Sequence, residues 1–410
     1  MLKHLKYLLG FSPCLGTRRA GAGASGRVGS AKSGSARTGS AMAAATAAAI
    51  TLSAVACVPH SLLPAAYAAE CPETVGADTE QIASQALRSD AYRPAHRFAD
   101  GTGVTVAVID TGVEPHPRLR LHPDNEPGDC QAHGTIVAGV IAAHDNGDGV
   151  VGVAPGAEIL GIRQEGDQRR EDTAGTIATL VDAIDEAIEH HVQIINISVV
   201  ACVPPGTALA NTALDQVIQK AEAHGIVIVA AAGNIGGPCA EHSQALPASH
   251  PLVVGVGATS DERTLATYSM PVEGFAFSAP GHVMAAVDPR GPGLAAATSS
   301  YNTTAVFEGT SFAAPLVAGT FALLRQRHPD ASPAQLRAML QHSVDPNTGV
   351  VDPLRSVTFR HEDAQHHQVQ LLARSPIRTQ GLSKLLLLLL GASLLGIVVL
   401  ALGRSREHTS

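Results

Sequence analysis

Short apolar runs rich in valine and isoleucine alternate with helical patterns in this chain, and this alternation limits the possible folds more than any other feature. The apolar runs are Val104–Ile109, Glu158–Arg163, Gln193–Ser198 and Ile226–Ala231, and the helical patterns are Gly134–His144, Ala174–His191 and Leu209–His224. Apolar strands separated by helices are typical of a parallel sheet that is covered by helices on both faces. The sequence therefore predicts an α/β fold, followed by shorter strands over 252–287 and helices at Thr310–His328 and Ser332–His342.

Three polar residues that could act together in catalysis lie at the ends of these elements. Asp110 ends the first strand, His133 begins the next helix, and Ser311 begins a later helix. In open α/β sheets, ligands bind at the carboxyl ends of the strands. A serine hydroxyl becomes a good nucleophile when an imidazole takes its proton, and a buried carboxylate holds that imidazole in the required tautomer. We therefore predict that Asp110 orients His133 and that His133 activates Ser311.

A fourth residue, Asn234, completes the expected constellation. The last apolar strand continues as Ala232-Gly233-Asn234, which would aim an amide donor at the oxyanion that forms when Ser311 attacks a carbonyl. The Ser311 backbone N–H, at the start of its helix, would be the second donor. Each residue taken singly could be a turn residue or a helix cap. In this order, with each at a strand end or a helix start, they predict a hydrolase that works by acyl transfer.

The distribution of charge argues against nucleic-acid binding. The 410-residue chain has a formal charge of −8. Residues 1–69 hold seven of the 28 basic side chains and none of the 36 acidic ones, so the remainder has a formal charge of −15. Such a domain repels phosphate backbones. Aromatic residues make up only 3% of the chain, which leaves few side chains on which bases could stack.

The two ends of the chain predict export and membrane anchoring. Residues 1–69 combine scattered positive charge with an apolar run and an Ala66-Tyr67-Ala68 cleavage pattern, as signal peptides do. The residues around Arg18-Arg19 fit a twin-arginine signal poorly, and those before Cys57 fit a lipidation site poorly. Leu385–Leu402 contains no charge and is long enough to cross a bilayer as a helix.

The charges after this apolar run set the expected orientation in the membrane. Arg404 and Arg406 follow it, so the positive-inside rule places the short tail in the cytoplasm and the folded domain outside. We therefore expect a signal region at 1–69, an N-terminal extension at 70–100, a peptidase domain at 101–345, a linker at 346–381, a transmembrane helix at 382–402 and a cytoplasmic tail at 403–410.

Four of the six cysteines remain when the signal region is excluded, and they are Cys71, Cys130, Cys202 and Cys239. In an exported domain they are expected to form disulfides, and three pairings are open. A zinc site is disfavoured, because no two of them have the short spacing of zinc ligands.

Other groups of polar residues also resemble ligand sites, but a turn or a solvent-exposed position is favoured for each of them. Asp145–Gly149 has the composition of a calcium loop without its later glutamate, so a turn is favoured. Solvated positions are favoured for His190 and His191 and for the linker histidines His361, His366 and His367. The sequence predicts no metal site, and the expected chemistry needs no cofactor.

The catalytic segments resemble those of the subtilases, over about residues 101–345. They are more similar still to the mycosins, the membrane-anchored subtilisin-like proteases of type VII secretion systems. Asp129-Cys130-Gln131-Ala132-His133-Gly134-Thr135 is similar to the mycosin segment around the catalytic histidine, and Glu308-Gly309-Thr310-Ser311-Phe312-Ala313-Ala314-Pro315 to the nucleophile segment. The resemblance implies a subtilisin-like fold and a serine endopeptidase that cleaves secreted proteins and works with the type VII membrane complex. The resemblance also allows an alternative, in which the domain caps or stabilises the secretion channel and proteolysis is secondary.

The resemblance also has implications outside the triad. It implies that Cys71 pairs with Cys130 and Cys202 with Cys239, and that residues 70–100 wrap onto the catalytic domain. Many subtilases have Leu-Gly-Gly after the strand-end serine, whereas this chain has Val-Val-Ala after Ser198. We expect Ser198, Val199, Val200 and Gly233 to line the substrate cleft, and the added bulk to give a narrow P1 pocket for small side chains. The substrate itself would bind as an added strand.

Overall fold

The computed structural model describes residues 71–164, 175–210, 212–236, 239–240, 242–261, 264–271, 276–300, 303–345 and 348–359. The expected signal region, transmembrane run and linker histidines lie outside these residues. Within the described ranges, no helix is both long and apolar enough to span a bilayer.

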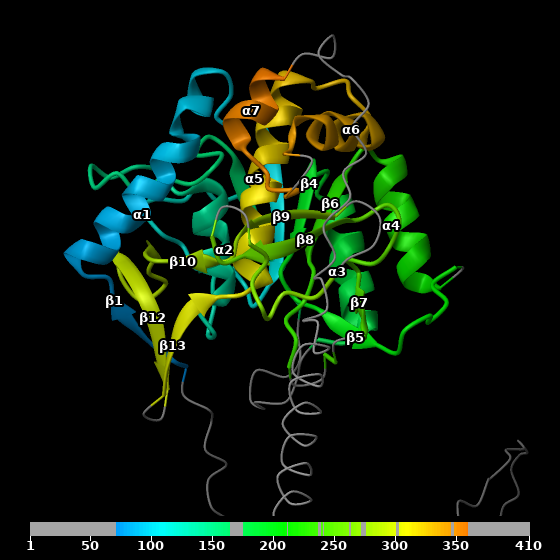
Figure 1. Ribbon diagram of the computed structural model, residues 1–410, viewed down its shortest axis with the longest axis horizontal. Coiled ribbons are helices and arrows are strands. Elements are labelled where there is room, and N and C mark those ends of the chain that lie inside the picture. The colour runs from blue at the N-terminus through cyan, green and yellow to red at the C-terminus, as the bar shows by residue number, and fades with distance from the viewer. Residues whose placement is uncertain are drawn as a thin grey trace, which may run out of the picture. The chain divides into compact units, whose positions relative to one another are not determined.

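A six-stranded parallel sheet forms the centre of the described domain. Its strands are β2 (Thr105–Asp110), β3 (Glu158–Arg163), β4 (Ile194–Ile197), β6 (Val227–Ala231), β8 (Val254–Thr259) and β9 (Ala276–Pro280). They lie in the order β3-β2-β4-β6-β8-β9 (Figure 1), and each neighbouring pair is parallel. The predicted α/β fold with a parallel sheet is therefore confirmed.

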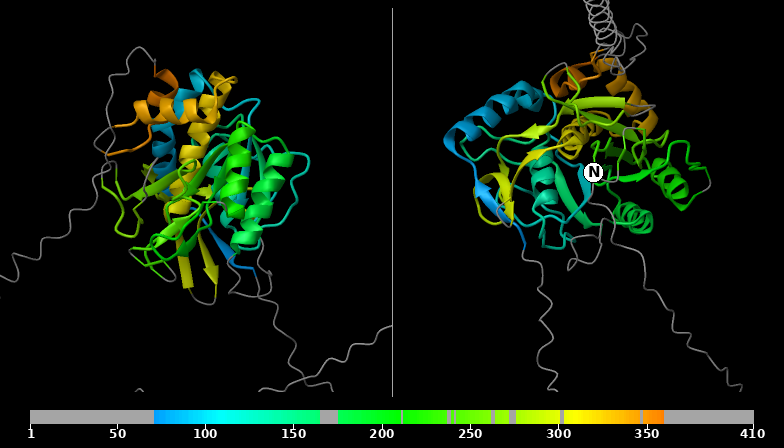
Figure 2. Two further views of the ribbon diagram at one scale, coloured as in Figure 1. Left: turned by 90° about the vertical axis from the view of Figure 1, so that its right-hand side faces the viewer. Right: turned by 60° about the horizontal axis from the view of Figure 1, so that its bottom comes forward.

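Helices cover both faces of this sheet. They are α2 (His133–Ala142) and α5 (Thr310–Arg327) on one face, and α3 (Ile177–Glu189) and α4 (Ala213–Ala223) on the other. Within β2, Val106 and Val108 join the core around α2 and α5, whereas Ala107 and Ile109 join the core around α3 and α4. Figure 2 (left) shows α3 and α4 in front of the sheet. Burial on both faces explains why the strands are apolar at nearly every position.

Polar caps decide where the helices begin, which explains why two helices start later than their patterns predict. The sequence pattern begins the first of them at 174 and the second at Leu209, but α3 begins after Thr176 and α4 after Thr212. Each threonine hydroxyl accepts the backbone N–H three residues later. A helix starts where such a partner satisfies its first N–H groups, not where the apolar period starts.

The N-terminal segment is built into a second sheet. Its strand β1 (Glu73–Gly76) pairs antiparallel with β12 (Leu294–Ser300), and β12 also pairs with β11 (Ala286–Val287) and with β13 (Thr303–Glu308), whose other neighbour is β10 (His282–Val283). Helix α1 (Thr79–Tyr92) and the 3-10 helix η1 (Arg93–Arg97) follow β1. The Tyr92 hydroxyl donates to the Val151 carbonyl at 2.7 Å. Figure 2 (right) shows this blue segment beside the yellow strands.

The folded domain extends beyond the predicted boundary at residue 345. After α6 (Pro333–Ser343), the expected linker contains a helix, α7 (Pro353–Thr358), which contacts α5, α6 and η1. The Val351 N–H donates to the Ser278 carbonyl at 2.9 Å, so this segment is also tied to β9. A six-residue helix is too short to show a period in the sequence, and the predicted linker over 346–381 was wrong for this part.

Candidate active site

Asp110 and His133 meet at the carboxyl edge of the central sheet. Asp110 is the last residue of β2 and is fully buried. Its Oδ1 lies 2.7 Å from Nδ1 of His133, the first residue of α2, and it accepts the Thr111 N–H at the same distance. A carboxylate acceptor at Nδ1 requires the proton to be there, which leaves the lone pair of Nε2 to accept another. The pair therefore has the orientation that a general base needs.

The surroundings of His133 favour its charged form. Burial lowers the pKa of the imidazole, but the charge and hydrogen bond of Asp110, with the nearby charge of Asp129, outweigh burial and raise the pKa above 6.5. An imidazolium that forms by taking a proton from a serine would be stabilised in the same way. The site therefore suits a base that is protonated during the reaction.

Ser311 lies in the first turn of α5. The ring of the next residue, Phe312, has its centroid 5.1 Å from that of His133, so α5 begins beside the Asp110–His133 pair. The buried Ser198 hydroxyl donates to the Ser311 carbonyl at 2.9 Å and accepts from the Asn196 amide at 3.0 Å. The side chain of Ser198, which the sequence places in the substrate cleft, thus holds the helix that carries Ser311.

Asn234 lies beside the start of α5, and Thr310 fixes its orientation. The Asn234 side-chain oxygen accepts both the backbone N–H and the hydroxyl of Thr310, each at 3.0 Å. The Thr310 hydroxyl accepts the Gly233 N–H at 3.1 Å. A Cβ built on Gly309 would lie 2.9 Å from the Asn234 Nδ2, so a larger residue there would crowd the amide. Because Asn234 is exposed, its NH₂ group can donate to a ligand.

The sequence profile of the subtilase family, peptidase S8, matches residues 101–368. The chain belongs to the subtilase family. Mycosin-1 of Mycobacterium tuberculosis (strain ATCC 25618 / H37Rv) is 34% identical to this subtilase in an alignment of 316 residues, and the alignment covers 65% of this chain and 71% of Mycosin-1.

Solved structures give the same result. The crystal structure of MycP1 with the N-terminal propeptide removed has a TM-score of 0.61 and 31% identity, covering 69% of this subtilase and 98% of that chain. A chain in the intact ESX-5 inner membrane complex has a TM-score of 0.62 and 28% identity, covering 81% of this subtilase and 93% of that chain. This subtilase is a mycosin-type serine endopeptidase.

Asp129 supports the Asp110–His133 pair, although sequence reasoning assigned it no role. It is buried, and its Oδ1 accepts the Thr111 hydroxyl at 2.7 Å. Its Oδ2 accepts both the backbone N–H and the hydroxyl of Thr135, at 2.8 and 2.7 Å. Burial raises the pKa of Asp129, against the effect of these donors. Because Thr111 adjoins Asp110 and Thr135 lies in the first turn of α2, Asp129 links the two segments that carry Asp110 and His133.

The wall beside Gly233 is formed by small and medium apolar side chains. A Cβ built on Gly233 would lie 3.0 Å from the Met270 sulfur, 3.3 Å from Val200 and 3.7 Å from Ala245. Gly233 also has φ +92°, a conformation that favours glycine. Val199, in contrast, packs against the core around α3 and α4. Of the two predicted valines, only Val200 therefore lies at this wall.

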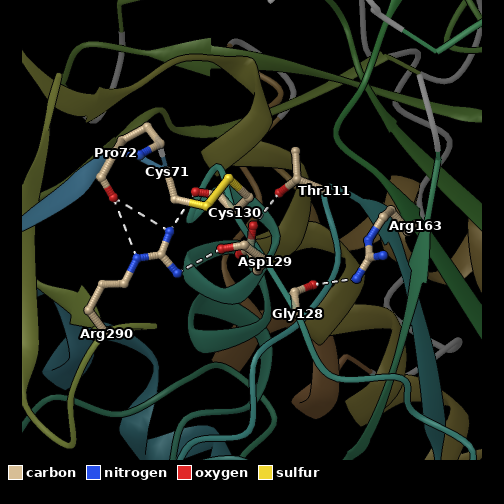
Figure 3. The surroundings of a disulfide bond; sticks show 8 residues. All are labelled: Cys71, Pro72, Thr111, Gly128, Asp129, Cys130, Arg163 and Arg290. Carbon is tan, nitrogen blue, oxygen red and sulfur yellow. Dashed lines mark hydrogen bonds between the residues drawn. A yellow bond between two sulfur atoms is a disulfide. The ribbon is translucent and has the colours of Figure 1, made fainter. Parts of the chain in front are cut away.

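Two disulfides tie loops to the domain, in the pairing that the resemblance implies. They are Cys71–Cys130 and Cys202–Cys239. In the second disulfide, Cys202 lies in strand β5 (Ala201–Val203), which pairs with β7 (Gln244–Leu246). Figure 3 shows the first beside Arg290, whose guanidinium donates to the carbonyls of Pro72, Asp129 and Cys130. One disulfide and one arginine thus connect the N-terminal segment to the loop before His133.

The loop at Asp145–Gly149 forms a turn, as the sequence favours. The Asp145 Oδ1 accepts the N–H groups of Gly147 and Gly149 at 2.9 and 3.1 Å, and Asp145 Oδ2 lies 2.8 Å from Arg93. Asp148 pairs with the buried Arg118. Burial raises the pKa of Asp145, but the hydrogen bonds from Arg93 and from the N–H groups of Gly147 and Gly149 outweigh it and lower that pKa. The Arg118 hydrogen bond lowers the pKa of Asp148, against a smaller effect of burial.

Sequence reasoning missed Asp129 and Thr310 because each was considered only as part of a motif. Both lie within the two motif segments given in the sequence analysis. Asp129 lies four residues before His133, Thr310 lies directly before Ser311, and both are buried in the fold. A buried polar side chain needs hydrogen-bond partners. Polar residues within four positions of a predicted catalytic residue are the signal that could have identified them.

Proposed function

We propose that this subtilase is a membrane-anchored endopeptidase of a type VII secretion system, and that Asp110, His133 and Ser311 form its triad. The observation that carries the proposal is the 2.7 Å hydrogen bond between buried Asp110 and His133, with the first turn of α5 beside them. That arrangement supplies an oriented base next to a serine at a helix start.

In the first step, the Ser311 Oγ attacks the carbonyl carbon of the scissile peptide bond while His133 Nε2 takes the hydroxyl proton. Asp110 keeps the proton on Nδ1 and stabilises the imidazolium. The new C–O bond turns the carbonyl oxygen into an oxyanion. The Asn234 NH₂ and the Ser311 backbone N–H donate to this oxyanion, and the dipole of α5 adds to their effect.

In the second step, the tetrahedral intermediate expels the amine, which receives the proton from His133. The product is an ester between the acyl part of the substrate and Ser311. A water molecule then attacks this ester, with His133 again taking a proton, and releases the acid product and the free serine. The described residues supply each proton transfer that these two steps need.

A fluorophosphonate probe tests the nucleophile, because such probes phosphonylate an activated serine. We expect one labelled peptide, which contains Ser311, and no label in Ser311→Ala. Ser332 also lies at a helix start, where its hydroxyl accepts the Gln335 N–H, but it has no imidazole base assigned to it. Ser332→Ala is therefore the matched control and should label as fully as the original chain; label on another serine would contradict the assignment of Ser311.

We propose that the S1 pocket accepts small P1 side chains. The bulk of Val200, Met270 and Ala245 around Gly233 supports this. A peptide library should show cleavage after small residues such as Ala. Val200→Gly should extend cleavage to Phe and Tyr, whereas Val199→Ala should leave the preference unchanged because Val199 packs in the other core. Efficient cleavage after Phe by the original chain would contradict the proposal.

We propose that the domain lies outside the cytoplasm on a C-terminal membrane anchor. The apolar run at 385–402 supports a single membrane helix, and the two disulfides support an oxidising compartment for the domain. The likeness to a chain in the ESX-5 inner membrane complex supports association with a type VII complex. Alkaline carbonate should leave the full chain in the membrane fraction and release a chain that ends before residue 382.

The second candidate function is to cap or stabilise the secretion channel. The same likeness to a chain within an assembled membrane complex favours it. Secretion should be compared between Ser311→Ala and deletion of the whole chain. If secretion survives the substitution and fails on deletion, transport depends on the scaffold; if both fail alike, it depends on catalysis.

A further inference from the structure

Two histidines and one aspartate converge at the opposite edge of the sheet from the triad. They are His122, Asp124 and His190, and their potential ligand atoms all lie within 4.8 Å of one another. The Asp124 Oδ2 is 3.3 Å from Nδ1 of His190 and 3.7 Å from Nδ1 of His122. We propose that these three side chains bind a divalent transition metal ion, of which Zn²⁺ is the natural probe.

Two of the three distances between ligand atoms suit a small ion. Zinc binds imidazole nitrogen and carboxylate oxygen at about 2.0–2.2 Å, so tetrahedral ligands lie about 3.3–3.5 Å apart. The distance between Asp124 and His190 already has that length, and the distance between Asp124 and His122 needs to shorten by only a few tenths of an ångström. Two imidazoles and a carboxylate are a donor set that zinc uses, with water as the fourth ligand.

The loop that carries His122 and Asp124 is held in place. The His122 N–H donates to the Ile159 carbonyl of β3 at 2.8 Å, and the Asn125 N–H donates to the His122 carbonyl at 3.0 Å. The Asp124 N–H also lies 3.3 Å from the His122 Nδ1, so the two side chains stay next to each other. These contacts fix the loop before an ion arrives.

The electrostatic surroundings also favour a cation. His190 is the C-cap of α3, where the helix dipole is negative, and the last turn of α3 contains no basic residue. Glu186, in the same turn, interacts with the charges of His190, Glu126 and Glu189. The site thus combines a negative helix end with several carboxylates, whose repulsion a bound cation would reduce.

The topology separates this site from catalysis. His122 is bonded to the start of β3, and His190 lies shortly before β4, so both are at the amino ends of the parallel strands. Asp110 lies at the carboxyl end of β2. A metal here would join the loop between β2 and β3 to the end of α3, and would act on stability rather than on the reaction. This proposal departs from the sequence prediction, which expected no metal and placed His190 on the solvated surface.

Titration of the full chain with ZnCl₂ tests the proposal, in a Ser311→Ala background that prevents self-cleavage. Calorimetry should detect one binding event that is lost, or weakened at least about tenfold, in His122→Gln, His190→Gln and Asp124→Asn. His224→Gln is the matched control, because His224 also caps a helix, α4, but belongs to no such cluster among the described residues. It should bind zinc like the parent.

A thermal melt gives a second readout. Zinc should raise the melting temperature of the parent and of His224→Gln, EDTA should reverse the rise, and the three ligand variants should show none of it. Because the parent and all variants share the catalytic and linker histidines, zinc bound there cancels in the comparison. Equal zinc binding by the parent and by all three ligand variants, or no binding by the parent, would overturn the proposal.

Discussion

At the scale of single residues, the proposed catalytic pair of Asp110 and His133 lies beside a second buried carboxylate. Asp129 contributes charge to the surroundings of His133, and it holds Thr111 and Thr135 on either side of the pair. Its side-chain hydrogen bonds go to these two threonines, so we assign it as a positioning residue. Its effects on charge and on geometry can be measured separately.

The pH profile should reveal the charge effect. His133 must be neutral to act as a base, so kcat/KM should rise as the pH passes through its pKa, with a midpoint above 6.5 because that pKa is raised. Asp129→Asn removes one of the charges that raise the pKa of His133. The pH at which kcat/KM rises should therefore move to a lower value. The stability of the fold changes with pH in the opposite direction to the activity. The stabilisation by protonated His133 is complete below about pH 6.5 and is lost as the pH rises through the raised pKa.

Two variants separate charge from geometry at this position. Asp129→Asn keeps one acceptor oxygen, whereas Asp129→Ala removes the links to both threonines and should lower kcat further, by about ten- to hundredfold in total. Asp330 is exposed shortly after the end of α5 and serves as the control. Asp330→Asn should leave the rise of kcat/KM at the same pH. If kcat/KM of Asp129→Asn rises at the same pH as in the original chain, Asp129 does not act through the charge of His133.

Thr310 is the second residue that acts through a neighbour. Its hydroxyl and N–H hold the Asn234 oxygen, and this leaves the Asn234 NH₂ facing outward. Asn234→Ala should lower kcat about 10²- to 10³-fold with little change in KM, a range measured on a subtilisin. Thr310→Val should give a smaller loss of the same kind and Thr310→Ser should restore activity. A loss in KM alone would contradict a role in transition-state stabilisation.

At the scale of elements, the contact between β2 and α2 requires a glycine. Gly134 lies in the first turn of α2, and a Cβ there would be 2.1 Å from the Gly112 carbonyl oxygen and 3.1 Å from the Asp110 Cβ. No side-chain rotation relieves a clash with backbone. The close approach of the two elements brings His133 onto Asp110, so it cannot widen without lengthening that hydrogen bond.

Gly134→Ala should therefore cost both stability and activity. We expect a lower melting temperature and a fall in kcat of about tenfold or more, since displacements near 1 Å at catalytic groups have effects up to about 10²-fold. Gly293→Ala is the control, because a Cβ at Gly293 meets nothing within 4 Å and its backbone is not in the left-handed region. Full activity in Gly134→Ala would mean that α2 can shift without disturbing the catalytic pair.

At the scale of the whole described domain, the N-terminal segment is joined to the active-site loop. Strand β1 extends the second sheet, and Cys71–Cys130 with Arg290 connects it to the loop that contains Asp129. The disulfide closes a loop of 59 residues. In the chain-entropy account, such a closure contributes about 4 kcal/mol at most.

Replacing both cysteines of this bridge should loosen the segment before the rest of the domain. Cys71→Ser/Cys130→Ser, in a Ser311→Ala background, should lower the free energy of unfolding by about 2–4 kcal/mol and expose residues 71–100 to an added protease. Cys202→Ser/Cys239→Ser should leave that segment protected, because its bridge lies beside β7. Equal protection of 71–100 in both double variants would show that β1 is held by its strand pairing alone.

Apolar periodicity and local chemistry were enough to predict the parallel sheet, its covering helices and the approximate positions of Asp110, His133, Asn234 and Ser311. These features depend on residues close in the sequence, since a strand buried on both faces must be apolar and the residues at its carboxyl end, where ligands bind, follow it directly. The helix α7 was missed because it is short and is stabilised by packing against α5 and η1.

Only the tertiary structure decided how residues distant in the sequence act on one another. It turned Ser198 toward the Ser311 carbonyl, directed Val199 and Val200 into different cores, and placed Asp129 between Thr111 and Thr135. It also brought His122 and Asp124 to His190. A sequence pattern specifies which residues are polar or apolar, but hydrogen bonds, clashes and charge interactions depend on distances that exist only after the chain has folded.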